Sequence, residues 1–205
     1  MNVTKCGCCT RLRRTDAVWS RRDKRSPKET VMSSAPKSVQ ATFDLKLFRI
    51  TGTWEPDTAE QQAAWELYVE LVTRVGVVQL RDGLTREALT SLYLMFGKTR
   101  DILTKYGPAI AMPKRANGIT FGYLAIGMLN NVLRPFLSYW HPELSDWEAR
   151  RPDNVSAKEY ERGWERDLEL RQHLDRLANE LRQFVIVLAE ACSVPAAIQL
   201  PGGSA

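Results

Sequence analysis

One apolar segment, Gly118–Pro142, limits what this chain of 205 residues can fold into more than any other stretch. A run of about 20 apolar residues is either a membrane-spanning helix or a helix buried on most sides of a bundle. Its second half carries Asn130, Asn131 and Arg134, and one charge inside a membrane costs about 2.5–3.5 kcal/mol on insertion scales. We therefore predict the central helix of an all-helical domain and no membrane span.

Much of the basic character of the chain lies in residues 1–40. This tail holds 10 of the 29 Lys and Arg residues but only 3 of the 24 Asp and Glu residues. The rest of the chain is slightly acidic and lacks the basic stripe that is typical of a nucleic-acid-binding domain. Because the tail has few large apolar residues and no helical or strand period, we predict a disordered basic tail followed by one domain over residues 41–200. Translation from Met32, which would remove most of the tail, is left open.

Three of the four cysteines, Cys6, Cys8 and Cys9, lie in the tail. A disulfide scaffold would spread its cysteines through the chain, and the N-terminus lacks the apolar core of a secretory signal. The sequence therefore predicts a reducing, cytoplasmic location. The cluster is open to three interpretations: a metal site, an acylation site or part of a solvated tail. No second cysteine pair with zinc-site spacing accompanies it.

Residues 41–52 alternate apolar and polar side chains, as a short strand does. An isolated strand is not stable. It must pair with residues 77–80, with another subunit or with a partner, or lie as an extended arm across the helices. We favour the arm.

Two amphipathic helices are predicted next, because apolar residues recur at a spacing of three to four. Asp57 or Thr58 can cap the first helix. Thr85 can cap the second, which Gly107 and Pro108 end. The central helix should be distorted at Pro135, which has no amide hydrogen to donate. It should end at Pro142, before a loop over residues 143–154.

The last predicted helix starts at a capping box of Ser156 and Glu159 and runs from Ala157 to near Cys192. It carries a heptad seam of Leu170, Leu174, Leu177, Leu181, Phe184, Leu188 and Ala191. About 36 residues would span roughly 54 Å, so one end should project or mediate dimerisation. Together these elements predict an all-α, up-and-down four-helix bundle with a long C-terminal helix, preceded by a short extended arm.

The polar residues of the central segment, Asn130, Asn131, Arg134 and His141, form the candidate binding site. Burying Arg134 without a partner would be prohibitive, so we expect an acidic partner or an exposed cleft beside it. The other interpretation, which we favour, is a structural network in which these side chains satisfy the backbone groups of the distorted helix.

Arg134 and His141 have six residues between them. This spacing resembles the Arg-x₄₋₆-His motif of HEPN-type ribonucleases, which are also small helical proteins. The resemblance implies metal-independent RNA cleavage, with Arg134 stabilising phosphate charge and His141 as the general acid or base. The match covers two residues, and this chain has Pro135 where the family usually has a polar residue, so these two are catalytic candidates only in this alternative.

A broader resemblance rests on the segments WELYVELVTR, LTREALTSLYLMFGKTRDIL, LNNVLRPFLSYWHPEL and VSAKEYERGW. Together they resemble an uncharacterised family of bacterial, mainly actinobacterial, helical proteins, which we expect to be linked to conflict or defence loci. The resemblance covers residues 42–200 and implies a single helical domain. It transfers no site residue.

The sequence has no glycine-rich phosphate loop, nucleophile elbow, metal-ligand spacing or redox cysteine pair. We therefore expect a non-catalytic protein–protein interaction module without a cofactor. It should contact a protein partner or a second copy through its C-terminal helix. The alternatives are the ribonuclease, which would make RNA a ligand, and an effector that acts on membranes through residues 119–140.

Overall fold

The structure, a computed structural model, describes residues 38–45, 48–74, 80, 82–115 and 118–197, and within 41–50 it describes only the backbone. All described residues lie in one compact unit, Ser33–Ala205. The predictions for residues 1–37 of the tail, for its cysteines and for the start at Met32 therefore lie outside the described residues. The last three residues of the predicted tail are described, and there the prediction of disorder is wrong, because Val39 and Gln40 belong to a strand and Val39 is buried.

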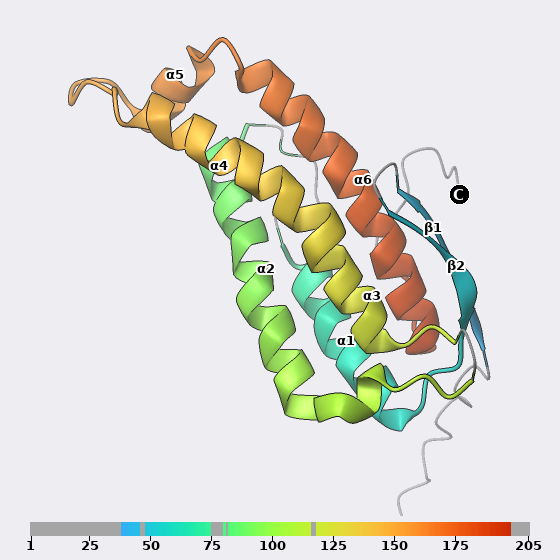
Figure 1. The fold of residues 1–205 in the computed structure, drawn as a ribbon. Helices are drawn as coiled ribbons and strands as arrows, with labels where there is room; N and C mark the ends of the chain where they lie inside the picture. The colour runs from blue at the N-terminus through green and yellow to red at the C-terminus, as the bar shows by residue number, and fades with distance from the viewer. Residues whose placement is uncertain (1–37, 46–47, 75–79, 81, 116–117, 198–205) are drawn as a thin grey trace, which may run out of the picture. The chain divides into compact units, whose positions relative to one another are not determined.

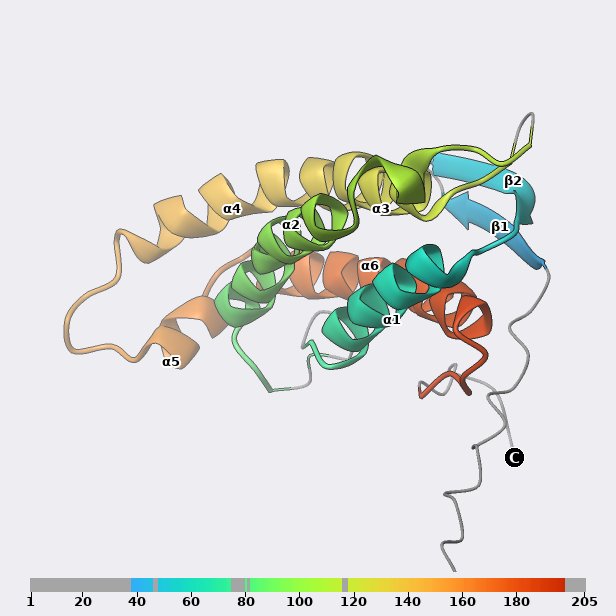
Figure 2. The ribbon, with the colours of Figure 1, turned by 90° about the horizontal axis from the view of Figure 1, so that it is seen from below.

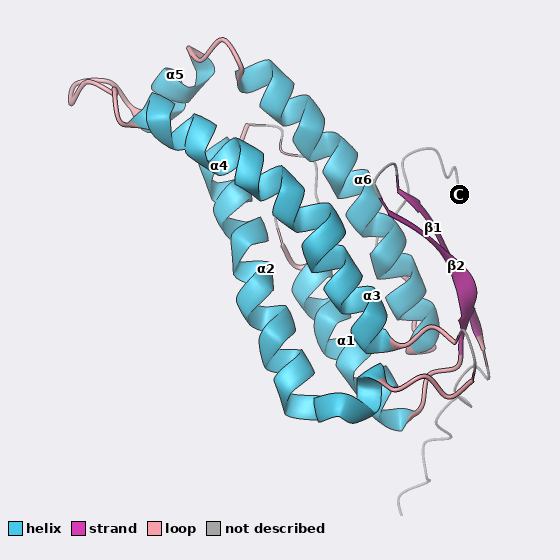
Figure 3. Cartoon of the chain, in the orientation of Figure 1, coloured by secondary structure: helices cyan, strands magenta, loops and turns pink. Residues whose placement is uncertain are grey.

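Most of the described residues are helical (Figure 3), which confirms the all-α class. The α-helices are α1 (Thr58–Val72), α2 (Thr85–Tyr106), α3 (Phe121–Gly127), α4 (Arg134–Glu148), α5 (Ala157–Arg162) and α6 (Asp167–Ala191). A 3₁₀ helix, η2 (Gly107–Ala111), follows α2, and a π-helix, η3 (Met128–Leu133), joins α3 to α4. The up-and-down four-helix arrangement stays a prediction.

The predicted strand pairs within its own segment, so the preference for an extended arm is wrong. β1 (Val39–Leu45) and β2 (Phe48–Trp54) form an antiparallel hairpin in which Val39 lies opposite Trp54. β1 contacts α6, and both Figure 1 and Figure 2 show the hairpin beside α6 and α3. Ile119 donates its amide to the carbonyl of Thr53 at 3.3 Å, so the backbone before α3 is fixed to the free edge of β2.

The starts of α1 and α2 are capped in different ways, one by a neighbouring residue and one by a residue far along the chain. Asp57 caps α1, as predicted, in a reciprocal capping box with Glu60. The predicted cap at Thr85 is wrong, because Thr85 is the first residue of α2. Its amide and hydroxyl both donate to Glu161 from α5. A buried carboxylate far along the chain thus replaces the local cap.

α3, η3 and α4 form one continuous rod (Figure 1). The amide of Arg134 bonds to the carbonyl of Leu129, five residues back, which is the wider π register. Pro135, which has no amide hydrogen, follows directly. The distortion predicted at Pro135 therefore takes the form of a π-helical segment.

The rod does not end at Pro142, and the predicted loop over residues 143–154 is wrong in its first half. α4 continues through Pro142 to Glu148. The missing amide of Pro142 would have bonded to the carbonyl of Ser138. Because Ser138 is exposed, water can reach that side of the helix and replace the lost hydrogen bond. The helix therefore continues past Pro142.

The predicted helix from Ala157 to Cys192 is two helices, because the chain turns between Arg162 and Asp167. The turn lets Glu161 reach the start of α2. It also buries Trp164, whose ring lies edge-on to Trp140 with 6.1 Å between centroids. Tertiary contacts on both sides of the turn therefore interrupt the helix.

The heptad seam of α6 is buried within the same chain at Leu170, Leu174, Leu177, Leu181, Phe184, Leu188 and Ala191. α6 packs against α1 and β1. With 25 residues it is close in length to α2, which has 22. Its length and its seam therefore no longer indicate a projecting or dimerising end.

Candidate functional site

A groove of about 610 Å³ runs between α2 and α4, and it contains two of the four predicted site residues. The two helices contact each other and lie side by side in Figures 1 and 2. The groove is lined by Tyr93, Leu94, Phe96, Gly97 and Arg100 from α2 and by Arg134, Leu137, Ser138, His141 and Pro142 from α4. We call it the α2–α4 groove.

The α2 side of the groove is apolar and open to solvent. Tyr93 is 61% exposed and Leu94 is 53% exposed. Gly97 lies nearly one turn further along, and a Cβ built there would meet nothing within 4 Å. Glycine inside a helix costs about 1 kcal/mol relative to alanine, and packing within the described chain does not require it here. Gly97 therefore widens the groove at the expense of helix stability.

Two guanidinium groups lie against the ring of Phe96. The guanidinium carbon of Arg100 is 5.7 Å from the ring centroid, and that of Arg134 is 5.3 Å from it. Arg134 also donates to Oδ1 of Asn130 from Nε at 3.2 Å and from Nη2 at 3.1 Å. Neither arginine forms an ion pair with a carboxylate of the described residues. This part of the groove therefore carries positive charge without a counter-charge of its own.

His141 lies in a charged network at the edge of the groove. Its Nδ1 is 3.0 Å from Nη1 of Arg86, whose Nε and Nη2 bind the carboxylate of Glu148 at distances down to 2.6 Å. A guanidinium only donates hydrogen bonds, so Nδ1 of His141 accepts and the ring is neutral. Nε2 is buried and makes no geometrically satisfactory hydrogen bond within the described part of the chain.

The same surroundings shift the titration of His141. Burial and the positive charge of Arg86 lower the pKa of the imidazole below its ordinary value. The main chain of Leu89 and the charge of Glu148 oppose this shift without cancelling it. His141 is therefore a neutral acceptor for Arg86, and neither of its nitrogens is free at the groove surface.

The four predicted site residues thus differ in their environment. Arg134 and His141 line the groove. Asn130 reaches it only through its contact with Arg134. Asn131 is half-buried and does not line it. Arg134 lies in an exposed cleft, and no acidic side chain of the described residues pairs with it.

The α2 half of the groove was missed by sequence reasoning. Tyr93 and Phe96 fit the apolar stripe of a helix that faces its core, and nothing singles out Arg100. Two signals were present: Leu94 falls beside the stripe, and Gly97 interrupts a helix that otherwise has good helix formers. Neither signal alone says which neighbour the exposed face would have.

A second cavity, of about 260 Å³, lies beside Glu60. The Glu60 side chain is almost fully buried. Its oxygens accept from Nε1 of Trp54 at 3.0 Å, from the amides of Phe121 at 3.0 Å and Asp57 at 3.2 Å, and from Lys114. The carboxylate thus joins the hairpin, the start of α1, the loop after η2 and the start of α3.

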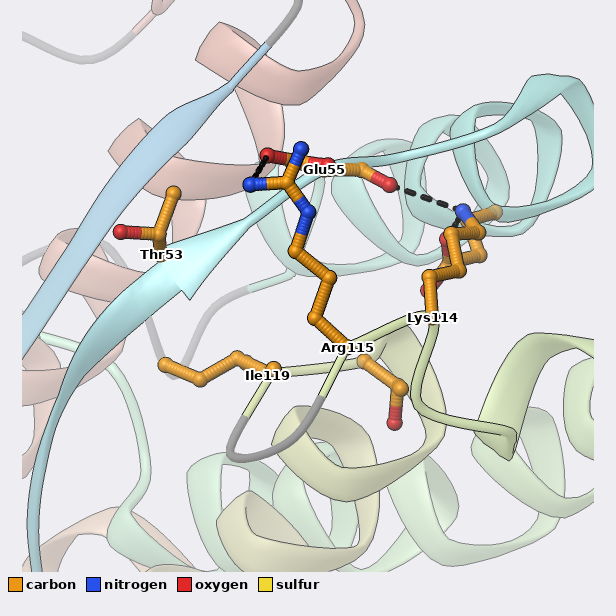
Figure 4. A pocket seen from close by; sticks show the side chains of 8 residues that line it. Thr53, Glu55, Lys114, Arg115 and Ile119 are labelled. Atoms are coloured by element: carbon orange, nitrogen blue, oxygen red, sulfur yellow. Dashed lines mark hydrogen bonds and ion pairs between the residues drawn. The ribbon is translucent and has the colours of Figure 1, made fainter.

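Figure 4 shows the charged side chains on the wall of this cavity. Lys114 donates to the carbonyl of Glu55 at 2.8 Å, and Arg115 pairs with the carboxylate of Glu55 at 3.1 Å. These charges are satisfied by one another. We therefore assign the cavity a structural role.

Within the described part of the chain, no group of three or more His, Cys, Asp or Glu side chains is placed to hold a metal ion. No described helix combines the length and the apolar character that crossing a membrane needs.

Comparisons with protein-family models, with curated proteins and with solved structures give no match for this chain. The resemblances drawn from sequence motifs therefore stay hypotheses. The function has to be argued from the residues of the groove.

Proposed function

We propose that this protein is a non-catalytic interaction module that binds a helical segment of a partner protein in the α2–α4 groove. The observation that carries the proposal is the exposed apolar wall of Tyr93 and Leu94 beside the open position at Gly97. An amphipathic helix binds such a groove through side chains spaced three to four residues apart.

The grouping of the exposed residues supports a binding surface. Isolated apolar residues on a protein surface are ordinary, and Leu168 on α6, which is 67% exposed, is an example. Tyr93 and Leu94 instead share one groove with Leu137 and Pro142 from the facing helix. Two packed helices also present ridges and grooves into which a third helix fits.

Gly97 supports close approach of a partner backbone. A residue without a side chain lets another main chain come near, and Gly97 has no such neighbour among the described residues. A glycine in the middle of α2 is explained if the partner occupies the space that a side chain at this position would fill. The heptad seam of α6, which suggested a contact surface in the sequence, is buried in the core of this chain. The α2–α4 groove therefore replaces it as the proposed contact surface.

Site-specific photo-crosslinking tests the proposal. A photoreactive amino acid is placed at Leu94 in the full chain, which is expressed in the cells it comes from. We expect a crosslink to a partner protein. The variant Gly97→Gln should reduce the crosslink yield about ten-fold, because its side chain occupies the groove. It should not destabilise the fold, because removing a helical glycine gains up to about 1 kcal/mol.

The same photoreactive residue at Leu168, which is exposed outside the groove, is the matched control. Crosslinks that are no stronger from position 94 than from position 168 would refute the proposal, as would a yield unaffected by Gly97→Gln. Crosslinks between two copies of the chain would identify the second copy as the partner.

A second candidate function is a metal-independent ribonuclease, favoured by the presence of Arg134 and His141 in one groove. For acid–base catalysis, His141 would have to release Nδ1 from Arg86 or bring Nε2 to the surface. Incubation with structured and unstructured RNA tests this function. Cleavage that His141→Ala abolishes supports it, whereas no cleavage, or cleavage that persists in this variant, removes it.

The resemblance to bacterial helical proteins supports a proposal about the partner, namely that it is encoded near this chain in a conflict or defence locus. Identifying the crosslinked partner and the position of its gene checks this point. The membrane-acting alternative through residues 119–140 stays a prediction. Liposome flotation of the full chain tests it.

A further inference from the structure

We infer that the α2–α4 groove selects a partner helix with an acidic side chain, whose carboxylate is bound by the guanidinium groups of Arg100 and Arg134. The inference rests on the proposed function and adds the chemistry of the partner. It starts from the composition of the groove, whose described lining includes two arginines and neither aspartate nor glutamate.

The ring of Phe96 contacts both guanidinium groups. Both lie within about 6 Å of its ring centroid, the range of a cation–π contact. Within the described residues, the only polar contact to either group is the neutral Asn130. A carboxylate bound here would neutralise positive charge and accept charge-assisted hydrogen bonds.

The stacked arrangement also prepares the site for binding. A guanidinium that already lies on an aromatic ring loses less rotamer freedom when it binds a carboxylate. Nearby arginines of this chain do have carboxylate partners. Arg86 binds Glu148 and Arg166 binds Glu143, each at 2.6 Å. The groove pair differs from these because neither arginine has an acidic partner among the residues that the structure describes.

The groove fits an acidic helix better than it fits RNA. Tyr93, Leu94, Leu137 and Pro142 give it apolar walls, which suit the apolar face of a peptide helix. An RNA-binding surface needs an extended basic patch, whereas 19 of the 29 basic residues and 21 of the 24 acidic residues lie after residue 40. Two positive charges within an otherwise slightly acidic domain match one or two carboxylates of a peptide.

Synthetic amphipathic helices test the inference against the full chain by fluorescence anisotropy. Three peptides share one leucine stripe and differ at the polar positions beside it, which are Glu, Gln or Lys. We expect the Glu peptide to bind at least about ten-fold more tightly than the Gln peptide, the range of charge-assisted hydrogen bonds. The Lys peptide should bind most weakly.

The double variant Arg100→Gln/Arg134→Gln should remove the preference for Glu, so that the Glu and Gln peptides bind this variant with equal affinity. Arg150→Gln/Arg151→Gln removes the same charge from exposed positions outside the groove and should keep the preference. Gly97→Gln should weaken the binding of all three peptides.

Each other outcome overturns the inference in a distinguishable way. If the Glu and Gln peptides bind equally and Gly97→Gln weakens both, the groove binds helices without selecting acids, and the proposed function stands. If no peptide binds in a way that Gly97→Gln alters, both ideas fail. If single-stranded RNA binds through Arg100 and Arg134 and the Glu peptide does not, the ligand is a nucleic acid.

Discussion

Replacing Glu60 with glutamine tests whether one buried carboxylate holds the hairpin, the loop after η2 and two helix starts in place. The change is nearly isosteric, so it leaves no cavity. The glutamine oxygen can still accept from Trp54 and Phe121, which bind Oε1 of Glu60. The amide nitrogen replaces Oε2 and faces two donors, the amide of Asp57 and the ammonium of Lys114.

The expected loss follows from these two donors. A hydrogen bond to a charged group contributes about 1.5–3 kcal/mol, and an unpaired buried donor costs a similar amount. Lys114 retains the carbonyl of Glu55 and the carboxylate of Asp57, and 37% of its side chain is exposed, so its share lies at the low end. We expect the free energy of unfolding to fall by about 3 kcal/mol.

Urea unfolding followed by helical circular dichroism measures this loss. With a slope of about 2 kcal/mol/M, the midpoint should fall by about 1.5 M at an unchanged slope. Glu66→Gln is the matched control on the same helix, because Glu66 also binds a lysine and a second donor, Tyr106, but is partly exposed. It should cost less than about 1 kcal/mol. Equal losses in the two variants would refute the role assigned to Glu60.

Two further predictions concern titration. The pKa of His141 is lowered from 6.5, so its contribution to stability is complete above pH 6.5 and is lost as the pH falls through the lowered value. An NMR titration should give a midpoint below 6.5, and a midpoint at or above 6.5 would contradict the contact with Arg86. Burial raises the pKa of the Cys192 thiol to about 11, so alkylation of Cys192 at pH 8, followed by peptide mass spectrometry, should be slow in the folded chain and fast in urea. Equal rates in the two conditions would show that the thiol is not buried.

The parts of the fold that local chemistry decides could be predicted from the sequence. The cap at Asp57 and the helix end at Gly107, which has φ of 67°, depend on residues within one turn. The helical class follows from the apolar spacing. The hairpin was only half recognised, because an alternating pattern shows that a strand exists but not which strand it pairs with.

The remaining differences have tertiary causes. The turn between α5 and α6 depends on Glu161 and Trp164, whose partners lie far away in the sequence. The candidate site was half predicted for the same reason. Polar residues within an apolar segment drew attention to Arg134 and His141, whereas Leu94 and Gly97 matter only because no described helix covers them.

The bond between Glu161 and Thr85 also bears on how the chain folds during its synthesis. The two residues are 76 positions apart. At about 5–20 residues per second, a ribosome needs roughly 4–15 s to reach Glu161 after it has added Thr85. During that time no side chain near the start of α2 caps its first turn. In addition, α1 and α2 leave the ribosome before α6, the helix that packs against α1. The emerging N-terminal half therefore exposes apolar surface for seconds, and a chaperone that binds nascent chains would find its site there.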